Sequence, residues 1–282
     1  TRLLWFFEGF TSYYDDLLLR RAGLIDDATY LRLLTKTANQ VLQAPGRHVQ
    51  SVAQASFDAW IRYYRPDENT ANSTISYYTK GALVALCFDL TLRQEGRTTL
   101  DAVMRALWQR SRGGSMAEAD FAAVLAELGG RDFGREIAAW VHGTAELPLH
   151  ALLRAQGVQV LEEPSQLAQA LGLRVSEANG SVMVKVVLDG GAAAQAGLAA
   201  GDEWLGIELP AATARGAKAP LAAWRLSRLD DLPLYAGAAR QVLALVARDK
   251  RLLRLPLQLP EKSTTWRLAP SGRAEAPAWP GH

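Results

Sequence analysis

A glutamate, Glu8, lies inside a dense run of aromatic and apolar residues at positions 4–14. On a helix, Glu8 falls away from the apolar stripe that Phe6, Phe10 and Tyr13 form. A carboxylate this close to aromatic rings is costly to bury unless a cation or hydrogen-bond donors meet it. Zinc is one such cation, because a carboxylate oxygen is an accepted third ligand beside two histidines. Glu8 is therefore a candidate metal ligand, with a partly exposed carboxylate as the ordinary alternative.

The segment around Glu8 resembles a motif of gluzincin aminopeptidases. Residues 5–11 read W-F-F-E-G-F-T and are similar to the W-x-x-E-G-F-[AT] motif of these zinc metallopeptidases. In those families this glutamate is the third zinc ligand, on the helix that follows the H-E-x-x-H helix. Residues 13–24 resemble the glycyl aminopeptidase branch more than aminopeptidase N. The resemblance implies that Glu8 binds zinc, the one cofactor expected, in a protein that removes small N-terminal residues such as Gly or Ala from peptides.

A tyrosine seventy residues further along the chain (78 minus 8) belongs to a second motif. Residues 75–84 resemble the Y-x-K-G-A-x-V segment of the same aminopeptidases, in which the tyrosine donates a hydrogen bond to the tetrahedral oxyanion. The matching position is Tyr78, and a phenol there suits a reaction that develops negative charge on oxygen. Gly81 would let this helix pack closely against a neighbour. A lone tyrosine on an apolar helix is more often a core residue, but the order and spacing of the two motifs favour Tyr78 as a catalytic residue.

The H-E-x-x-H motif is absent from these residues. None of the four histidines, His48, His142, His150 and His282, stands in such a motif, and we interpret His142 and His150 as surface or helix-cap residues. Residues 1–5 read T-R-L-L-W, already within an apolar helical pattern. We therefore expect the chain to be the C-terminal portion of a zinc aminopeptidase, and to be inactive alone because one carboxylate is not a zinc site.

A third motif, at residues 189–207, resembles the S-P-A-x-x-A-G-L-x-x-G-D-x-I run of bacterial PDZ domains. Gly197 is expected to take the left-handed position after a short helix, and Gly201 to form the turn into the next strand. In such domains backbone N–H groups hold a peptide C-terminus. Here the residues in that position are Leu171, Gly172 and Leu173.

Apolar spacing divides the chain into a helical part and a part with strands. Helices are predicted up to Gly23, over 27–42 and 75–92, at 100–108, after a capping box at 115–118, and from 133 to 143. Short Val- and Leu-rich runs predict strands at 158–161, 182–188, 241–246 and 252–257, the last two as a hairpin. We thus predict a multidomain chain: an all-α C-terminal part of a gluzincin catalytic unit (1–155), an α+β PDZ-like domain (156–260) and a mobile tail (261–282).

Composition narrows the classes of partner. Of the 282 residues, 49% are hydrophobic and 21% charged, with a net charge of +2, which argues against nucleic acid or a membrane surface as the main partner. The expected partners are a peptide substrate and a peptide C-terminus at the PDZ-like domain. A single cysteine, Cys87, allows no internal disulfide and is compatible with a reducing compartment, so we expect a cytoplasmic location.

Two other functions remain open from the sequence. The chain could be a non-enzymatic helical scaffold whose PDZ-like module binds peptide C-termini. It could also be an inactive relative of the peptidases with a structural role, because the residues that would decide are not among these 282.

Overall fold

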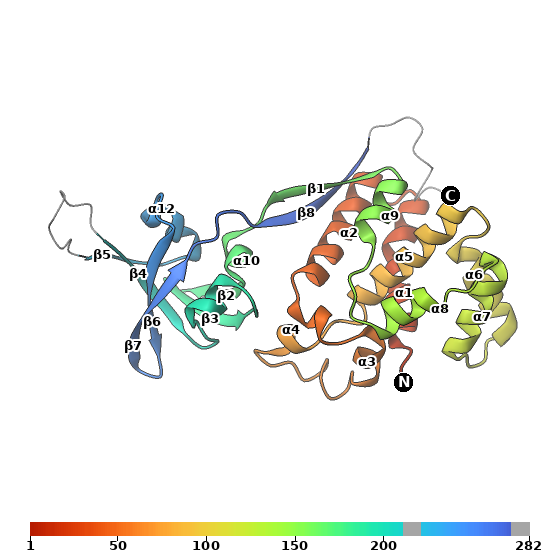
Figure 1. The fold of residues 1–282 in the computed structure, drawn as a ribbon, viewed down its shortest axis with the longest axis horizontal. Helices are drawn as coiled ribbons and strands as arrows, with labels where there is room; N and C mark the ends of the chain where they lie inside the picture. The colour runs from red at the N-terminus through yellow and green to blue at the C-terminus, as the bar shows by residue number, and fades with distance from the viewer. Residues whose placement is uncertain (211–220, 272–282) are drawn as a thin grey trace. The chain divides into compact units, whose positions relative to one another are not determined.

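A computed structural model describes residues 1–210 and 221–271, which form two compact units (Figure 1). The helical unit consists of residues 1–66, 73–162 and 266–271. The sheet unit consists of residues 67–72 and 163–265, with the gap noted above. Each unit has its own hydrophobic core.

The helical unit is built around two long helices, α1 and α5, that pack against each other (Figure 1). Its helices are α1 (Leu4–Arg21), α2 (Asp27–Leu42), η1 (Pro45–His48), α3 (Val52–Phe57), α5 (Thr79–Glu95), α6 (Leu100–Ser111), α7 (Glu118–Gly129), α8 (Gly134–Glu136) with the π-helical turn η2 (Ile137–His142), and α9 (Leu149–Ala155). The short helix α4 (Thr70–Ser73) lies where the chain passes between the units. The helices predicted from apolar spacing are therefore confirmed.

The core explains why α1 and α5 are central. The stripe predicted on α1 is buried, and its rings make edge contacts with Phe121 of α7. Helix α5 is buried nearly all round, as its continuous apolar sequence predicts. Cys87 is fully buried in this helix, and burial raises the pKa of its thiol.

A buried carboxylate connects three of these helices. Asp89 of α5 accepts a hydrogen bond from the hydroxyl of Tyr13 on α1 at 2.7 Å. It also accepts from Nε of Arg93 at 3.0 Å and from the backbone N–H of Leu100, the first residue of α6, at 3.2 Å. Because Asp89 is 1% exposed, these donors replace the water that its charge would otherwise bind.

Helix starts follow local hydrogen bonds, with one correction. The Asp26 side chain accepts from Thr29 N–H, which begins α2 at the predicted residue. The capping box predicted at 115–118 is wrong: α7 begins at Glu118, and the Asp120 side chain accepts from the backbone N–H of Ala117. The acidic side chain that meets this helix start is thus two residues later than the pattern suggested.

The sheet unit contains an antiparallel sheet in the order β2-β3-β4-β6-β7, with β5 paired to β4. The strands are β2 (Leu173–Ala178), β3 (Ser181–Val187), β4 (Glu203–Pro210), β5 (Leu221–Arg225), β6 (Gln241–Arg248) and β7 (Arg251–Gln258), and the short helices are α10 (Leu167–Leu171), α11 (Ala192–Ala196), η3 (Leu229–Asp231) and α12 (Leu232–Ala236). Gly197 takes the left-handed position after α11, and Gly201 has a positive φ just before β4, both as predicted. Strands β6 and β7 form the predicted hairpin, with Arg248 opposite Arg251.

The prediction of a mobile tail from residue 261 is wrong for part of that range. β8 (Thr264–Pro270) pairs with β1 (Val158–Pro164), and the two strands run side by side in Figure 1. In the helical unit, Asn39 of α2 exchanges two hydrogen bonds with the backbone of Trp266, and Leu268 is buried. The Pro- and Ser-rich composition of this region gave no pattern typical of a strand. The strand is held instead by contacts with a helix that is distant in the sequence. The rest of the predicted tail, 272–282, lies outside the described residues.

No helix within the described residues is long and apolar enough to cross a membrane.

Candidate functional site

The two sequence motifs meet where α1 crosses α5. A Cβ added to Gly9 would lie 2.6 Å from Cα of Gly81, and one added to Gly81 would lie 2.7 Å from the carbonyl oxygen of Trp5. Real Cβ atoms do not approach backbone so closely, so glycine at both positions lets the helix axes come together. The close packing predicted for Gly81 is confirmed. Glu8 precedes one glycine and Tyr78 lies one helical turn before the other, so the crossing brings their parts of the two helices together.

Glu8 is half-buried on α1, and its side chain makes no hydrogen bond or ion pair with residues 1–210 or 221–271. Its backbone carbonyl accepts from the hydroxyls of Thr11 and Ser12, which keeps those two side chains on their own helix. The charge of Glu8 nevertheless acts on Tyr78, whose pKa it raises. Glu8 is thus a carboxylate near Tyr78 with no cation from the described chain to balance it.

Tyr78 belongs to a group of tyrosines that sequence motifs do not reveal. Its hydroxyl lies 3.4 Å from that of Tyr64, and Tyr77 donates to the same Tyr64 oxygen at 3.2 Å. The hydrogen bond with Tyr64, followed by burial and the nearby charge of Glu8, raises the pKa of Tyr78 to about 12. The hydrogen bonds from Tyr77 and Tyr78 lower the pKa of Tyr64. Tyr78 therefore keeps its proton at neutral pH and remains able to donate it to an oxygen anion.

Lys80, two residues after Tyr78, is buried and holds a loop against the start of α5. Its Nζ donates to the backbone carbonyl of Arg47 at 3.2 Å. Burial lowers the pKa of Lys80 to about 8, with the nearby carboxylate of Glu146 opposing the effect. Gly46 packs on the backbone of Thr74, just before this segment, which fixes the loop from the other side.

Three of the four histidines contact residues other than Glu8. His142 contacts Glu118 at 2.7 Å, His48 lies 3.4 Å from Glu146, and the ring of His150 faces Trp266. His282 is outside the described residues. In the part of the chain that the structure describes, no group of three or more His, Cys, Asp or Glu side chains could hold a metal. Glu8 could supply one ligand, but these residues do not complete a zinc site.

The residues predicted to bind a peptide C-terminus lie in the sheet unit, between a short helix and a strand. Leu171 is the last residue of α10, Gly172 takes a left-handed conformation, and Leu173 begins β2. The N–H of Gly172 already donates to the carbonyl of Gln169 at 3.0 Å. The structure brings the three residues together, but this donor is not free, and peptide binding here stays a prediction.

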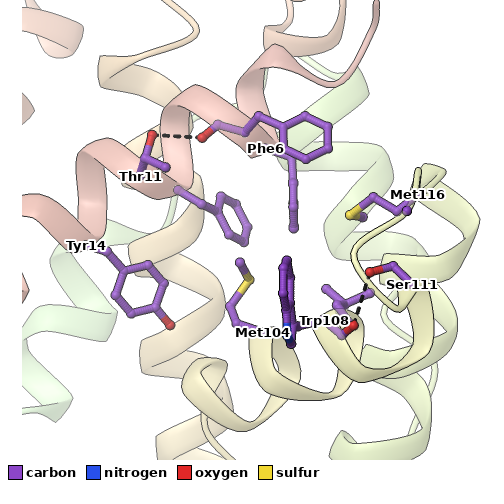
Figure 2. Close-up of a pocket in the computed structure, with 11 residues that line it drawn as sticks. Phe6, Thr11, Tyr14, Met104, Trp108, Ser111 and Met116 are labelled. Atoms are coloured by element: carbon purple, nitrogen blue, oxygen red, sulfur yellow. Dashed lines mark hydrogen bonds between the residues drawn. The ribbon is translucent and has the colours of Figure 1, made fainter.

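An apolar cavity of about 270 Å³ lies between α1 and α6 (Figure 2). Phe6 and Tyr14 face Met104 and Trp108 across it in Figure 2, and Phe10 also belongs to the lining. Three hydroxyls belong to its lining: those of Thr11 and Ser111 bond to their own helices, at Phe7 O and Trp108 O, and that of Tyr14 is buried. The cavity therefore provides few hydrogen-bonding groups for a peptide backbone. Its lining is apolar, whereas the surroundings of Glu8 and Tyr78 are polar.

The comparisons with known proteins agree with the first two motifs. Residues 1–84 match the model of the M61 glycyl aminopeptidase family. The fold is similar to a crystal structure of an aminopeptidase N family protein from Idiomarina loihiensis, with a TM-score of 0.82 and 29% sequence identity. The match covers 96% of this chain and 47% of that one, so this chain spans less than half of its length. No curated protein sequence matches this chain.

Proposed function

We propose that this chain, whose residues 1–84 match the model of the M61 glycyl aminopeptidase family, is the C-terminal part of a zinc-dependent aminopeptidase. One observation carries the proposal. The Gly9–Gly81 crossing brings together the parts of α1 and α5 that hold Glu8 and Tyr78, the two residues to which the family resemblance assigns chemistry.

The proposal gives each residue one task. Glu8 contributes one carboxylate ligand to zinc, and the ligands that complete the site come from sequence beyond these 282 residues. Tyr78 donates its hydroxyl hydrogen to the oxygen that becomes negative when the peptide carbonyl is attacked. Its raised pKa keeps that hydrogen in place across the range in which peptidases work.

The substrate in this proposal is a peptide with a small N-terminal residue, Gly or Ala. Support for this preference comes from the family resemblance of residues 1–84. The described residues do not make a complete zinc site, so we derive no reaction step through the metal.

The test uses the protein encoded together with any coding sequence in frame upstream of Thr1. Zinc content is measured by mass spectrometry, and activity with Gly- and Ala-p-nitroanilide. We expect one zinc per chain, lost in Glu8→Gln and retained in the control Glu118→Gln, whose carboxylate lies 2.7 Å from His142. Full zinc occupancy and activity in Glu8→Gln would show that the ligand assignment is wrong. The 282-residue chain by itself should bind no zinc tightly and show no activity.

A further inference from the structure

Residues 57–64, which begin at the last residue of α3, present two different faces. Backbone hydrogen bonds continue the helix as successive turns, from Asp58 N–H to Gln54 O and from Tyr64 N–H to Ala59 O. Ala59 is fully buried, and the ring of Tyr63 lies 5.0 Å from that of Tyr77. The inner face thus holds the segment in place against the start of α5.

The outer face carries an exposed wall of large apolar side chains: Phe57, Trp60, Ile61 and Tyr64. Trp60 is 76% exposed and stacks on Tyr64, with ring centroids 5.0 Å apart and planes at 30°. Single exposed apolar residues are ordinary, but four on one short segment, held by a buried inner face, are typical of a surface that binds something.

This wall is continuous with the candidate site. The Tyr64 hydroxyl lies 3.4 Å from the Tyr78 hydroxyl, and the Tyr64 ring carries the stack with Trp60. A path of two contacts therefore leads from the proposed oxyanion donor to an exposed indole. A peptide that is bound at the Tyr78 hydroxyl and extends towards Tyr64 would reach the wall.

We propose that Trp60 and Tyr64 form a substrate subsite that takes a large apolar or aromatic side chain from the second or third residue of the peptide. The inference rests on the proposed function. In an aminopeptidase the peptide extends in one direction only from the cleaved bond, and an extended chain advances about 3.3 Å per residue. The small first residue has no side chain that could reach the wall, whereas the residues after the cleaved bond do.

Stacking explains which side chains the wall would favour. A flat indole face accepts an aromatic ring in an offset or edge arrangement, and such pairs add to the burial of apolar area. The Tyr64 hydroxyl is already engaged by Tyr77 and Tyr78, so the exposed part of the wall is its rings. We therefore infer selectivity for apolar over polar side chains at these positions.

The test compares the tripeptides Ala-Phe-Gly, Ala-Gly-Phe and Ala-Gly-Gly on the zinc-loaded protein described above. Wild type should prefer one of the Phe peptides. Trp60→Ala should lower kcat/KM for that peptide about fivefold, the size of an aromatic pair, and leave Ala-Gly-Gly unchanged. Trp60→Glu should lower it further, because a charge replaces the apolar face.

Two matched variants separate the explanations. Trp108→Ala removes another exposed tryptophan of the helical unit, 71% exposed, and should leave the Phe/Gly ratio as in wild type. Tyr64→Phe keeps the ring and should keep the ratio. An unchanged ratio in both Trp60 variants would overturn the subsite. A zinc-loaded wild type that hydrolyses none of the three peptides would instead count against the proposed function.

Discussion

Gly9 and Gly81 face each other across the crossing of α1 and α5, so close that neither position has room for a Cβ. Each glycine is a near neighbour of a candidate functional residue, Glu8 on one helix and Tyr78 on the other. The separation of those side chains therefore depends on how closely two backbones approach. A methyl group at the crossing would change that separation without touching either functional group.

Gly81→Ala should destabilise the protein by about 1–3 kcal/mol, the usual cost of forcing an extra carbon into a packed contact. Its Cβ would meet the backbone of Trp5, which cannot move aside as a flexible side chain could. Urea unfolding measures the effect. Gly134→Ala is the control, because the new Cβ would meet only the side chain of Asp132, and it should change stability by less than about 0.5 kcal/mol. Equal effects of the two substitutions would contradict the account of the crossing.

Tyr78→Phe should lower kcat about 100-fold in the zinc-loaded protein, as loss of one oxyanion donor does. Zinc content should not change, since the phenol is not proposed as a ligand. The control is Tyr235→Phe, in the sheet unit, where the ring stacks on Trp224. Steady-state kinetics with Ala-p-nitroanilide decide, and a Tyr78→Phe protein with wild-type kcat would remove Tyr78 from the reaction.

Asp89→Ala should cost about 3–5 kcal/mol in the free energy of unfolding, because it leaves the partly buried Arg93 without its closest carboxylate. The hydroxyl of Tyr13 and the N–H of Leu100 would each lose an acceptor as well. Chemical denaturation is the measurement. The exposed Asp15 offers a matched Asp15→Ala control on α1, expected within about 0.5 kcal/mol of wild type.

Lys80 makes stability depend on pH in an unusual direction. Burial lowers its pKa from 10.5 to about 8 in the folded protein, so between these values the unfolded chain binds more protons than the folded one. Stability from this group therefore rises as pH increases from about 8 to 10.5, by about 1.4 kcal/mol per unit of pKa difference. Subtracting the free energy of unfolding of Lys80→Met from that of wild type at each pH cancels the titration of all other groups. Between pH 8 and 10.5 the free energy of unfolding of wild type should rise by about 2–3 kcal/mol relative to that of Lys80→Met.

An arginine at the same position provides the control for this titration. Lys80→Arg stays protonated throughout, so its stability relative to Lys80→Met should not change with pH. A flat difference between wild type and Lys80→Met would show that Lys80 is better solvated than its burial indicates.

A substitution in the turn between β6 and β7 should stabilise the protein. Asp249 and Lys250 have φ values of 49° and 65°, the left-handed pair of a two-residue hairpin, in which glycine is preferred at the second position. Lys250→Gly should stabilise the protein by about 1 kcal/mol. Lys250→Ala removes the same charge but keeps Cβ, and should give no such gain. Thermal unfolding of the two variants tests this, and equal melting temperatures would contradict it.

Much of the fold follows from local sequence. The apolar stripe of α1 and the Asp26 cap of α2 act within a few residues, so pattern and propensity predict them. The β6–β7 hairpin is also local. β8 was missed because Trp266 is held by Asn39, 227 residues earlier, and no short window of sequence contains both.

The candidate site, too, was predictable from the sequence only in part. Glu8 and Tyr78 stand in motifs with fixed spacing, but the proximity of their helices requires two glycines that only the fold brings together. Tyr64 and Lys80 could not be assigned roles from sequence. Their roles depend on contacts with Tyr77, Tyr78 and the Arg47 carbonyl, and the one available signal was the unusual density of aromatic residues at 57–64.

The burial of Cys87 has a practical consequence. The thiol of Cys87, the one cysteine of the sequence, is buried in α5 and kept protonated. The native protein should therefore not react with maleimides or iodoacetamide. A cysteine introduced at an exposed position such as Arg62 would then be the one residue that a thiol reagent labels. The fluorescence of a label there would report peptide binding at the neighbouring aromatic wall. In the unmodified chain, the rate at which Cys87 becomes alkylated would time how often the centre of the helical unit opens.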